Sequence, residues 1–232
     1  MAKGPEASPL LARRSLNRYY ATLEGSAVEL RAVAKRMDCS LNDVYIAVLC
    51  GGLARYHERM GMPVASIPLA MPVSIRRPED PIDSNRFVGA RIAAPLSATD
   101  VAERAGRIRA AVLEVRAEPA LGAFNVLAPV AGRLPMWLLS SLVKVPPSDV
   151  QASNFPTWTE PRYLGRAKLL STFNFGPLAL SALMSVMVTY SGNFNIGLNI
   201  DPVAVSEPST LVELIANELD LLLSPSPIAV GS

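Results

Sequence analysis

The sequence predicts a layered α/β (α+β) domain in which a mixed or antiparallel sheet is flanked by helices. In the first half of the chain, apolar residues recur mostly at helical spacing. In the second half, short apolar runs are separated by turn residues and followed by one more helical stretch. The 232 residues, 50% of them hydrophobic, suit one large domain or two small ones and exclude a disordered chain.

Two serines, each followed three positions later by an acidic residue, predict helix starts at Ser26 and Ser40. The second helix, expected over about residues 42–60, is apolar on most of its sides, which indicates burial against other elements. Gly51 and Gly52 lie inside this helix without the spacing of a phosphate-binding loop. We therefore interpret the two glycines as a place where another helix packs closely.

Two extended segments, residues 67–75 and 87–94, come next. The first contains two prolines, which predicts an edge strand, or a strand interrupted where no backbone donor is needed. Residues 100–117 have the pattern of an amphipathic helix. Residues 119–145 are helical in pattern but interrupted by prolines and a glycine, and their very apolar part, 135–143, suits a core helix, a tunnel wall or a membrane-surface contact.

Beyond Lys144 the pattern changes from helices to loops and strands. Residues 146–161 have the composition of a loop. A hairpin signal, Ser191-Gly192-Asn193, joins the last two of three strand-like runs, which lie at residues 167–175, 182–190 and 194–201. A final helix is expected to begin near Thr210, with Glu213 completing a capping box.

We divide the chain into a polar N-terminal tail (residues 1–14), one domain (15–223) and a polar C-terminal tail (224–232). We find no signal peptide and no uninterrupted apolar run of the roughly 20 residues that a membrane-spanning helix needs. Two cysteines in a chain of this length fit a reducing compartment, so we expect a cytoplasmic protein. The mean hydropathy of +0.27 suggests contact with lipid or with a partner surface.

The net charge and the small numbers of histidines and cysteines exclude several functions. A net charge of +2, from 22 basic and 20 acidic residues, provides no electrostatic footprint for nucleic-acid binding. One histidine, His57, and two cysteines show no spacing typical of a metal site. His57 stands at the polar end of the second helix, where we expect an exposed, structural side chain. A mechanism that needs two histidines cannot run on this polypeptide alone.

Two polar motifs are candidates for a functional site. Asn42 and Asp43 head the buried second helix, where short polar side chains can accept hydrogen bonds from backbone N–H groups. Ser153-Asn154-Phe155-Pro156 lies in the expected loop ahead of a strand, where Ser and Asn can hydrogen-bond the backbone of a turn. From the residues alone, a structural role is favoured for both motifs, and a site role stays open for the second.

Five short segments, in the same order, resemble the wax ester synthase/diacylglycerol acyltransferase family. Ser84 replaces the glycine of the family's GNr motif, and Thr157-Trp158 replaces the Gly-Pro that follows SNvP in the family. The resemblance extends over residues 15–223. The segments are SLNDVYIAV (40–48) with GLARY (52–56), MPVSIR (71–76), Asn85-Arg86, SNFP (153–156), and YSG (190–192) with GLNID (197–201).

The resemblance implies the C-terminal half of a chloramphenicol-acetyltransferase-like two-domain fold. Family enzymes transfer an acyl group from acyl-CoA, a co-substrate and not a bound cofactor, to diacylglycerol or a long-chain alcohol. The general base is the second histidine of an HHxxxDG motif in the N-terminal domain, which this sequence lacks. The family motifs imply a supporting role, and no catalytic one, for Asn42, Asp43, Ser153, Asn154 and Pro156.

Three interpretations follow from the missing motif. The chain is the C-terminal half of a split acyltransferase that pairs with an N-terminal half, or an inactive remnant that binds lipid, or part of a longer reading frame in which Met1 is not the true start. In the first case, we expect the isolated chain to expose apolar surface where the other half docks. Lipid substrates also suggest peripheral contact with the inner face of the membrane or with lipid droplets.

Overall fold

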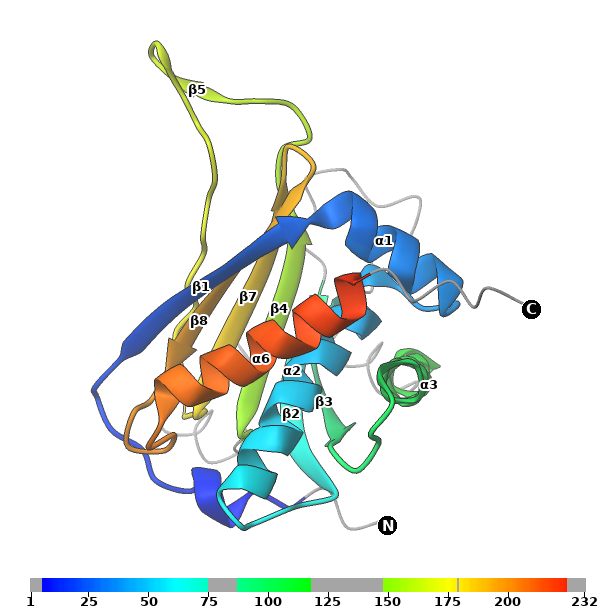
Figure 1. Cartoon of the computed structure of the whole chain (residues 1–232), viewed down its shortest axis with the longest axis vertical. Coiled ribbons are helices and arrows are strands. Elements are labelled where there is room, and N and C mark those ends of the chain that lie inside the picture. The colour runs from blue at the N-terminus through cyan, green and yellow to red at the C-terminus, as the bar shows by residue number, and fades with distance from the viewer. Residues whose placement is uncertain (1–5, 75–86, 118–147, 179, 225–232) are drawn as a thin grey trace, which may run out of the picture.

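The computed structural model describes residues 6–74, 87–117, 148–178 and 180–224. In these ranges six strands form one sheet in the order β1-β8-β7-β4-β2-β3, with the helices on one face (Figure 1). Strands β7, β4 and β2 are parallel neighbours and the outer pairs are antiparallel, which confirms the predicted mixed sheet. The strands are β1 (Tyr19–Ser26), β2 (Ser66–Ser74), β3 (Phe87–Pro95), β4 (Val150–Pro156), β7 (Leu183–Tyr190) and β8 (Asn193–Ile200).

The long helix α2 lies in the middle of the helical layer and is buried on most sides, as expected from its composition. The hydrophobic core lies between this layer and the sheet. A two-stranded ribbon, β5 (Tyr163–Leu164) with β6 (Ala167–Lys168), extends away from the sheet (Figure 1). The helices of the described ranges are η1 (Pro9–Leu11, a 3-10 turn), α1 (Ala27–Arg36), α2 (Leu41–Arg59), α3 (Val101–Ala117) and α6 (Pro208–Leu223).

The hairpin between β7 and β8 is confirmed. Ser191 and Gly192 both have positive φ angles, 47° and 89°, and Tyr190 is paired with Asn193. A two-residue turn with positive φ at both central residues matches the right-handed twist of the flanking strands. Glycine is favoured in such turns because it adopts a positive φ without steric cost. The turn therefore determines the register of the two strands.

Two strands of the sheet were not predicted. β1 is an edge strand whose residues alternate between half-buried and exposed from Tyr19 to Glu24, a period of two that sequence analysis could have detected. The expected loop at residues 146–161 is wrong because it contains β4. This strand is short and polar, and it pairs with β2 and β7, which are distant in sequence, so its local composition resembles that of a loop.

The strand expected at residues 167–175 is also wrong. Only its first two residues pair, in the β5–β6 ribbon, and the chain then returns across the sheet face opposite the helices. There the Asn199 side chain donates a hydrogen bond to the Gly176 carbonyl over 2.9 Å. Residues that cover a sheet and residues within one are both apolar, so composition does not separate the two cases.

The two prolines of β2 do not mark an edge, because β2 lies between β4 and β3. The Pro68 carbonyl accepts a hydrogen bond from the Asp149 N–H, so the nitrogen of Pro68 faces the same side as β4. Pro72, four residues on, faces that side too, but pairing between β2 and β4 extends only over Leu69 and Ala70. The missing N–H groups therefore stand where no backbone donor is needed, as the alternative prediction expected, but the strand itself is not interrupted between Ser66 and Ser74.

The expected caps have mixed outcomes. Ser40 and Asp43 form a reciprocal capping box at the start of α2, and Ser26 accepts a hydrogen bond from the Glu29 N–H at the start of α1. The last helix begins at Pro208 instead of Thr210, and its cap position, Glu207, makes no side-chain hydrogen bond to the helix backbone. A proline in the first turn starts this helix without a capping box.

Some predictions fall outside the described residues. They include the helical segments at 119–145 with their apolar part at 135–143, and the motif residues at 75–76 and 85–86. In the N-terminal segment assigned to a polar tail, residues 6–14 pack against the domain. Leu11 is fully buried in the core and Ser8 is 2% exposed.

Gly51 and Gly52 allow α6 to approach α2, as predicted. A Cβ atom on Gly52 would lie 2.9 Å from the backbone nitrogen of Ile215, and one on Gly51 would overlap the Glu218 carboxylate. That carboxylate accepts a hydrogen bond from Arg104 of α3 over 3.0 Å, with both side chains at least 94% buried. The absence of a side chain at Gly51 thus makes room for a buried ion pair between α3 and α6.

Glu218→Gln tests how much the domain depends on the buried Glu218 carboxylate, which also accepts a hydrogen bond from the half-exposed Arg55 of α2 over 2.5 Å. The substitution leaves the Arg104 guanidinium buried without a countercharge, so we expect the free energy of unfolding to fall by about 3 kcal/mol in urea denaturation. The matched control is Glu103→Gln, which breaks the exposed pair with Arg107 and should cost less than about 1 kcal/mol. Equal losses in the two variants would contradict the role of the buried pair.

Candidate functional site

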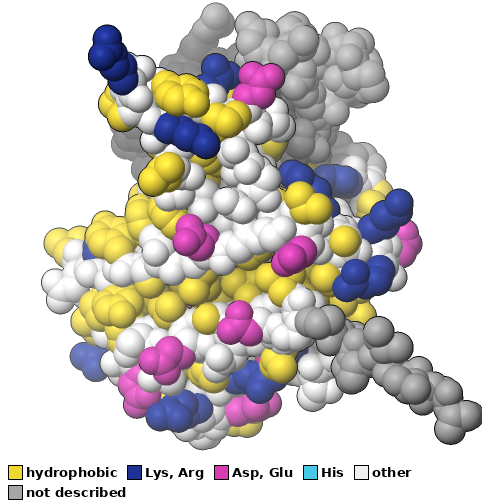
Figure 2. Space-filling model, turned by 45° about the horizontal axis from the view of Figure 1, so that its top comes forward, with side chains coloured by type: hydrophobic (Ala, Val, Ile, Leu, Met, Phe, Trp, Pro, Cys, Tyr) yellow, Lys and Arg dark blue, Asp and Glu magenta, His cyan; other side chains and the backbone are white. Residues whose placement is uncertain are grey.

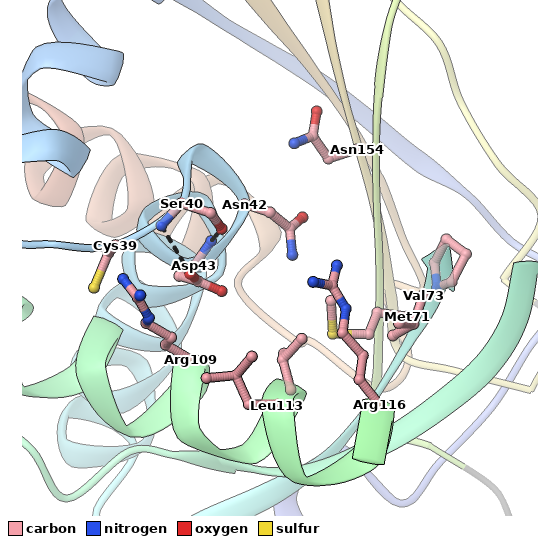
Figure 3. Close-up of a pocket in the computed structure, with 12 residues that line it drawn as sticks. Cys39, Ser40, Asn42, Asp43, Met71, Val73, Arg109, Leu113, Arg116 and Asn154 are labelled. Atoms are coloured by element: carbon pink, nitrogen blue, oxygen red, sulfur yellow. Dashed lines mark hydrogen bonds between the residues drawn. The ribbon is translucent and has the colours of Figure 1, made fainter. Parts of the chain in front are cut away.

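A pocket of about 510 Å³ lies on the helical side of the sheet, where β2 and β4 end (Figure 3). The start of α2 forms one wall and the last three turns of α3 form another. Carboxyl ends of parallel strands are frequent locations for ligand sites. The lining residues are Cys39, Ser40, Asn42, Asp43, Met71, Pro72, Val73, Arg109, Val112, Leu113, Arg116 and Asn154.

The first turn of α2 places Asn42 and Asp43 in this pocket. Asp43 is largely occupied by its cap, because its carboxylate accepts a 2.8 Å hydrogen bond from the Ser40 N–H while its own N–H donates to the Ser40 hydroxyl. Asn42 points into the open space of the pocket (Figure 3), and its side chain makes no hydrogen bond with another described residue. Asp43 therefore holds the helix start, while Asn42 is available to a ligand.

Strand β4 brings Asn154 to the same pocket. Successive strand residues face opposite sides of a sheet, so Asn154 faces the helices and Ser153 faces the other side. Pro156, at the end of β4, is exposed. Of the five motif residues, the structure thus brings Asn42, Asp43 and Asn154 together at the pocket, while Ser153 and Pro156 do not line it.

Two arginines of α3 were missed as candidates. Arg109 and Arg116 are seven residues apart, two turns of helix, and both extend toward the start of α2 (Figure 3). Arg109 forms an exposed ion pair with Asp38 at 3.4 Å, whereas Arg116 has no ion pair within the described ranges. The seven-residue spacing was the available signal, but a charged helix face usually indicates only exposure to solvent.

The rest of the lining is mainly apolar. Met71, Val73 and Val112 are at least 94% buried, and the Leu113 side chain remains 52% exposed. Cys39 adds a thiol whose pKa is raised, chiefly by burial and also by the Asp43 carboxylate. The thiol is therefore protonated near neutral pH and is a weak nucleophile.

The prediction that His57 is exposed is wrong, because its side chain is fully buried. Its Nδ1 lies 2.7 Å from the Leu53 carbonyl and its Nε2 lies 2.8 Å from the Ser8 hydroxyl. A carbonyl only accepts, so Nδ1 carries the proton and Nε2 accepts from Ser8. The N-terminal segment, which sequence analysis placed in a tail, thus covers the polar end of α2.

The Ser8–His57 contact has the geometry of a nucleophile and a base, but not their surroundings. Both side chains are closed off from solvent, at 2% and 0% exposure. The third group, Asp149, accepts a 2.6 Å hydrogen bond from the Ser8 N–H and lies near the Arg14 guanidinium, instead of bonding to the histidine ring. We conclude that this cluster anchors the N-terminal segment.

His57 also lies far from the pocket. Fifteen residues of α2 separate it from Asn42, a rise of roughly 22 Å along the helix axis at about 1.5 Å per residue. The one histidine of the chain therefore cannot act on a ligand held beside Asn42 and Asn154. In the ranges that the structure describes, no group of three or more His, Cys, Asp or Glu could hold a metal ion, and no helix is long and apolar enough to cross a membrane.

The buried histidine predicts a pH dependence of stability. Burial is the main cause that lowers the His57 pKa below its ordinary value of 6.5, so folding favours the neutral ring. Below about pH 6.5 the unfolded chain binds more protons, and the free energy of unfolding therefore decreases as pH falls from 8 until the pKa in the folded state is passed.

His57→Gln removes this titration, so urea denaturation should show a smaller loss of stability between pH 8 and 6 in the variant than in the wild type. Burial raises the pKa of Asp149, which contributes in the opposite direction, and the His57 ring acts on this carboxyl in turn. The same comparison in an Asp149→Asn background removes the contribution of Asp149. The same pH dependence in both proteins would contradict the neutral, buried state of His57.

Comparisons with known proteins identify the family of the chain. Residues 84–223 match the family described as the WS/DGAT C-terminal domain. The chain is 35% identical over 223 residues to "Putative diacyglycerol O-acyltransferase Rv2484c" of Mycobacterium tuberculosis (strain ATCC 25618 / H37Rv), a match that covers 96% of this chain and 45% of the relative. It is 31% identical over 196 residues to a second protein of that strain, "Putative diacyglycerol O-acyltransferase Rv3087", covering 76% of this chain and 40% of the relative.

Among solved structures, the wax ester synthase/diacylglycerol acyltransferase from Marinobacter aquaeolei VT8 has a TM-score of 0.66 at 19% identity, with 95% of this chain and 53% of that chain covered. This likeness shows the fold, one half of the chloramphenicol-acetyltransferase-like architecture. The chain spans about half the length of these proteins. With the match over residues 84–223, these similarities show that the chain belongs to the wax ester synthase/diacylglycerol acyltransferase family and contains its C-terminal domain.

Proposed function

We propose that this chain is the C-terminal half of an O-acyltransferase that moves an acyl group from acyl-CoA to the hydroxyl of diacylglycerol or a long-chain alcohol. An N-terminal half with the HHxxxDG motif, in the same or another polypeptide, supplies the general base. The observation that carries the proposal is the separation of the pocket from the buried His57, at opposite ends of α2. The pocket residues orient substrate, and the base comes from outside the chain.

The side chains of the pocket support this division of roles. A general base should titrate near the working pH and reach the attacking hydroxyl. The guanidinium groups of Arg109 and Arg116 only donate hydrogen bonds, the Cys39 thiol has a raised pKa, and the Asp43 carboxylate is held in its capping box. Asn42 and Asn154 can donate and accept hydrogen bonds but do not exchange protons at neutral pH. The described lining therefore binds but lacks a suitable base.

Exposed apolar side chains support a partner half. The segment from residue 157 to 174, here called the arm, extends beyond the sheet and carries the β5–β6 ribbon (Figure 1). Leu164 and Leu170 on the arm are 87% and 79% exposed, and Trp158 is 48% exposed. Figure 2 shows hydrophobic side chains exposed among charged ones on the face it presents. Such apolar exposure is typical of a surface that another domain or protein covers.

The second candidate function is a lipid-binding module without turnover. The same exposed leucines of the arm favour it, because apolar side chains at the tip of an extended ribbon can also enter a lipid surface. The two functions differ in one outcome: only the acyltransferase half forms ester when an N-terminal half is present. Under either function, the protein would work next to a membrane or a lipid droplet.

The decisive experiment is an acyl-transfer assay with labelled acyl-CoA and either diacylglycerol or a long-chain alcohol. We expect no ester from this chain alone, and ester formation when it is co-expressed with a family N-terminal half that carries HHxxxDG. Replacing the second histidine of that motif by alanine should abolish the product, since the base is lost. Ester formed by this chain alone, or no ester with any such half, would overturn the proposal.

Neighbouring residues of β4 provide a matched test of the pocket. In the paired enzyme, Asn154→Ala should lower kcat/KM about tenfold, because it removes hydrogen bonds to bound substrate. Ser153→Ala, one residue away but on the other face of the sheet, should leave kcat/KM within about twofold of the wild type. Similar losses in the two variants would indicate a general effect on β4 and contradict a specific role of Asn154.

A further inference from the structure

We propose that Arg116, together with Arg109, Asn42 and Asn154, forms a binding site for the phosphate group of a phosphate ester. The group could belong to coenzyme A or to a phospholipid headgroup, which share this chemistry. The identity of the whole ligand rests on the proposed function. The phosphate site itself is inferred from the residues that line the pocket.

The first argument is the lack of hydrogen-bond partners. The side chains of Asn42, Asn154 and Arg116 make no hydrogen bond or ion pair with any described residue, although all three line the same pocket. Figure 3 shows Arg116 directed toward Asn42, with Asn154 on the far side of the opening. An arginine carries five N–H donors and each amide carries two. The pocket thus presents an excess of donors that a ligand rich in acceptors would satisfy.

The second argument is the direction of the donors. They come from three elements: the start of α2, the end of α3 and strand β4. A carboxylate accepts in one plane through two oxygens, whereas a phosphate monoester has three terminal oxygens arranged as a tetrahedron. Donors that converge from several directions match the tetrahedral group better, and guanidinium pairs readily with phosphate through two parallel hydrogen bonds.

The third argument is the local charge. Arg109 is partly neutralised by Asp38, whose side chain is 97% exposed, at 3.4 Å. Asp43 is the acidic residue among the described lining residues, and one of its oxygens is already bonded to the Ser40 N–H. Among the described lining residues, Arg116 therefore supplies the positive charge that has no ion-pair partner. Arg109 assists it after the exposed Asp38 side chain exchanges its ion pair for water.

The fourth argument is the size and polarity of the pocket. A volume of about 510 Å³ exceeds what one phosphate group fills, and Met71, Val73 and Val112 give the remainder an apolar lining. A ligand that satisfies both parts carries a phosphate at one end and a less polar segment beside it. Both coenzyme A and a phospholipid have this combination, whereas inorganic phosphate alone leaves the apolar part uncovered.

Calorimetric titration of the full chain tests the site without requiring catalysis. The probes are coenzyme A, 3′-dephospho-coenzyme A, short-chain dioctanoyl phosphatidic acid and, as a carboxylate control, decanoate. Arg116→Gln should raise the Kd of the phosphate ligand about tenfold or more, since charged hydrogen bonds are lost. Arg116→Lys should give an intermediate Kd, because the charge is retained and the two-pronged geometry is not.

Arg107→Gln is the matched control. Arg107 is also on α3, is 52% exposed and pairs with Glu103, but it does not line the pocket. The Arg107→Gln variant should bind the phosphate ligand with the Kd of the wild type. Circular dichroism should show that all variants keep the wild-type helix content. A loss of binding that is the same in Arg107→Gln and Arg116→Gln would overturn the proposal, since it would reflect the net charge of α3.

The remaining outcomes are also decisive. Arg116-dependent binding of coenzyme A, or of phosphatidic acid, supports the site and identifies which source supplies the phosphate. If coenzyme A binds more tightly than its 3′-dephospho form, the 3′-phosphate is the bound group. Binding of no phosphate ligand, binding insensitive to Arg116→Gln, or a preference for decanoate would overturn the proposal.

These results are separable from those of the acyl-transfer assay. Arg116-dependent binding without ester formation in the paired enzyme would refute the acyltransferase function and retain the anion site. Conversely, the Arg116→Gln variant of the paired enzyme could form ester with an unchanged KM for acyl-CoA and bind phosphatidic acid as tightly as the wild type. That result would retain the acyltransferase function and refute the anion site.

Discussion

The buried ion pair between Arg104 and Glu218 determines how the three long helices meet. Arg104 of α3 donates to Glu218 of α6 and to the Ala47 carbonyl inside α2, each over 3.0 Å. A buried charge is tolerated only where such partners surround it, so the helices cannot shift without leaving one group unsatisfied. The pocket depends on this arrangement, because α3 carries Arg109 and Arg116 past the start of α2.

The described lining of the pocket offers hydrogen-bond donors and positive charge to a ligand but contains no suitable base for catalysis. Amides and guanidinium groups converge from three elements on one opening, and the one histidine of the chain is used elsewhere. There His57 joins α2 to the N-terminal segment through Ser8. One helix thus has two separate tasks: its start lines the ligand pocket, and its end anchors residues 6–14. This separation is the physical basis for our proposal that the chain is half of a catalytic unit.

Most of the helices and the hairpin could be predicted because their signals are local. The Ser40–Asp43 box and the positive-φ turn at Ser191-Gly192 each act within a few residues. Strand β4 could not be predicted in this way, since its pairing partners β2 and β7 lie far away in sequence. The burial of His57 was missed for the same reason: its partner Ser8 is 49 residues away, and α2 alone suggests an exposed end.

The sequence by itself determined the family resemblance, the layered fold class and the absence of the HHxxxDG motif. It also placed Asn42 and Asn154 among the candidate residues, without a reason to bring them together. Only the tertiary structure decided that these two amides share a pocket with Arg109 and Arg116, while Ser153 faces the other way. The physical reason is that a site built from α2, α3 and β4 depends on long-range packing and strand register, which no local pattern of residues encodes.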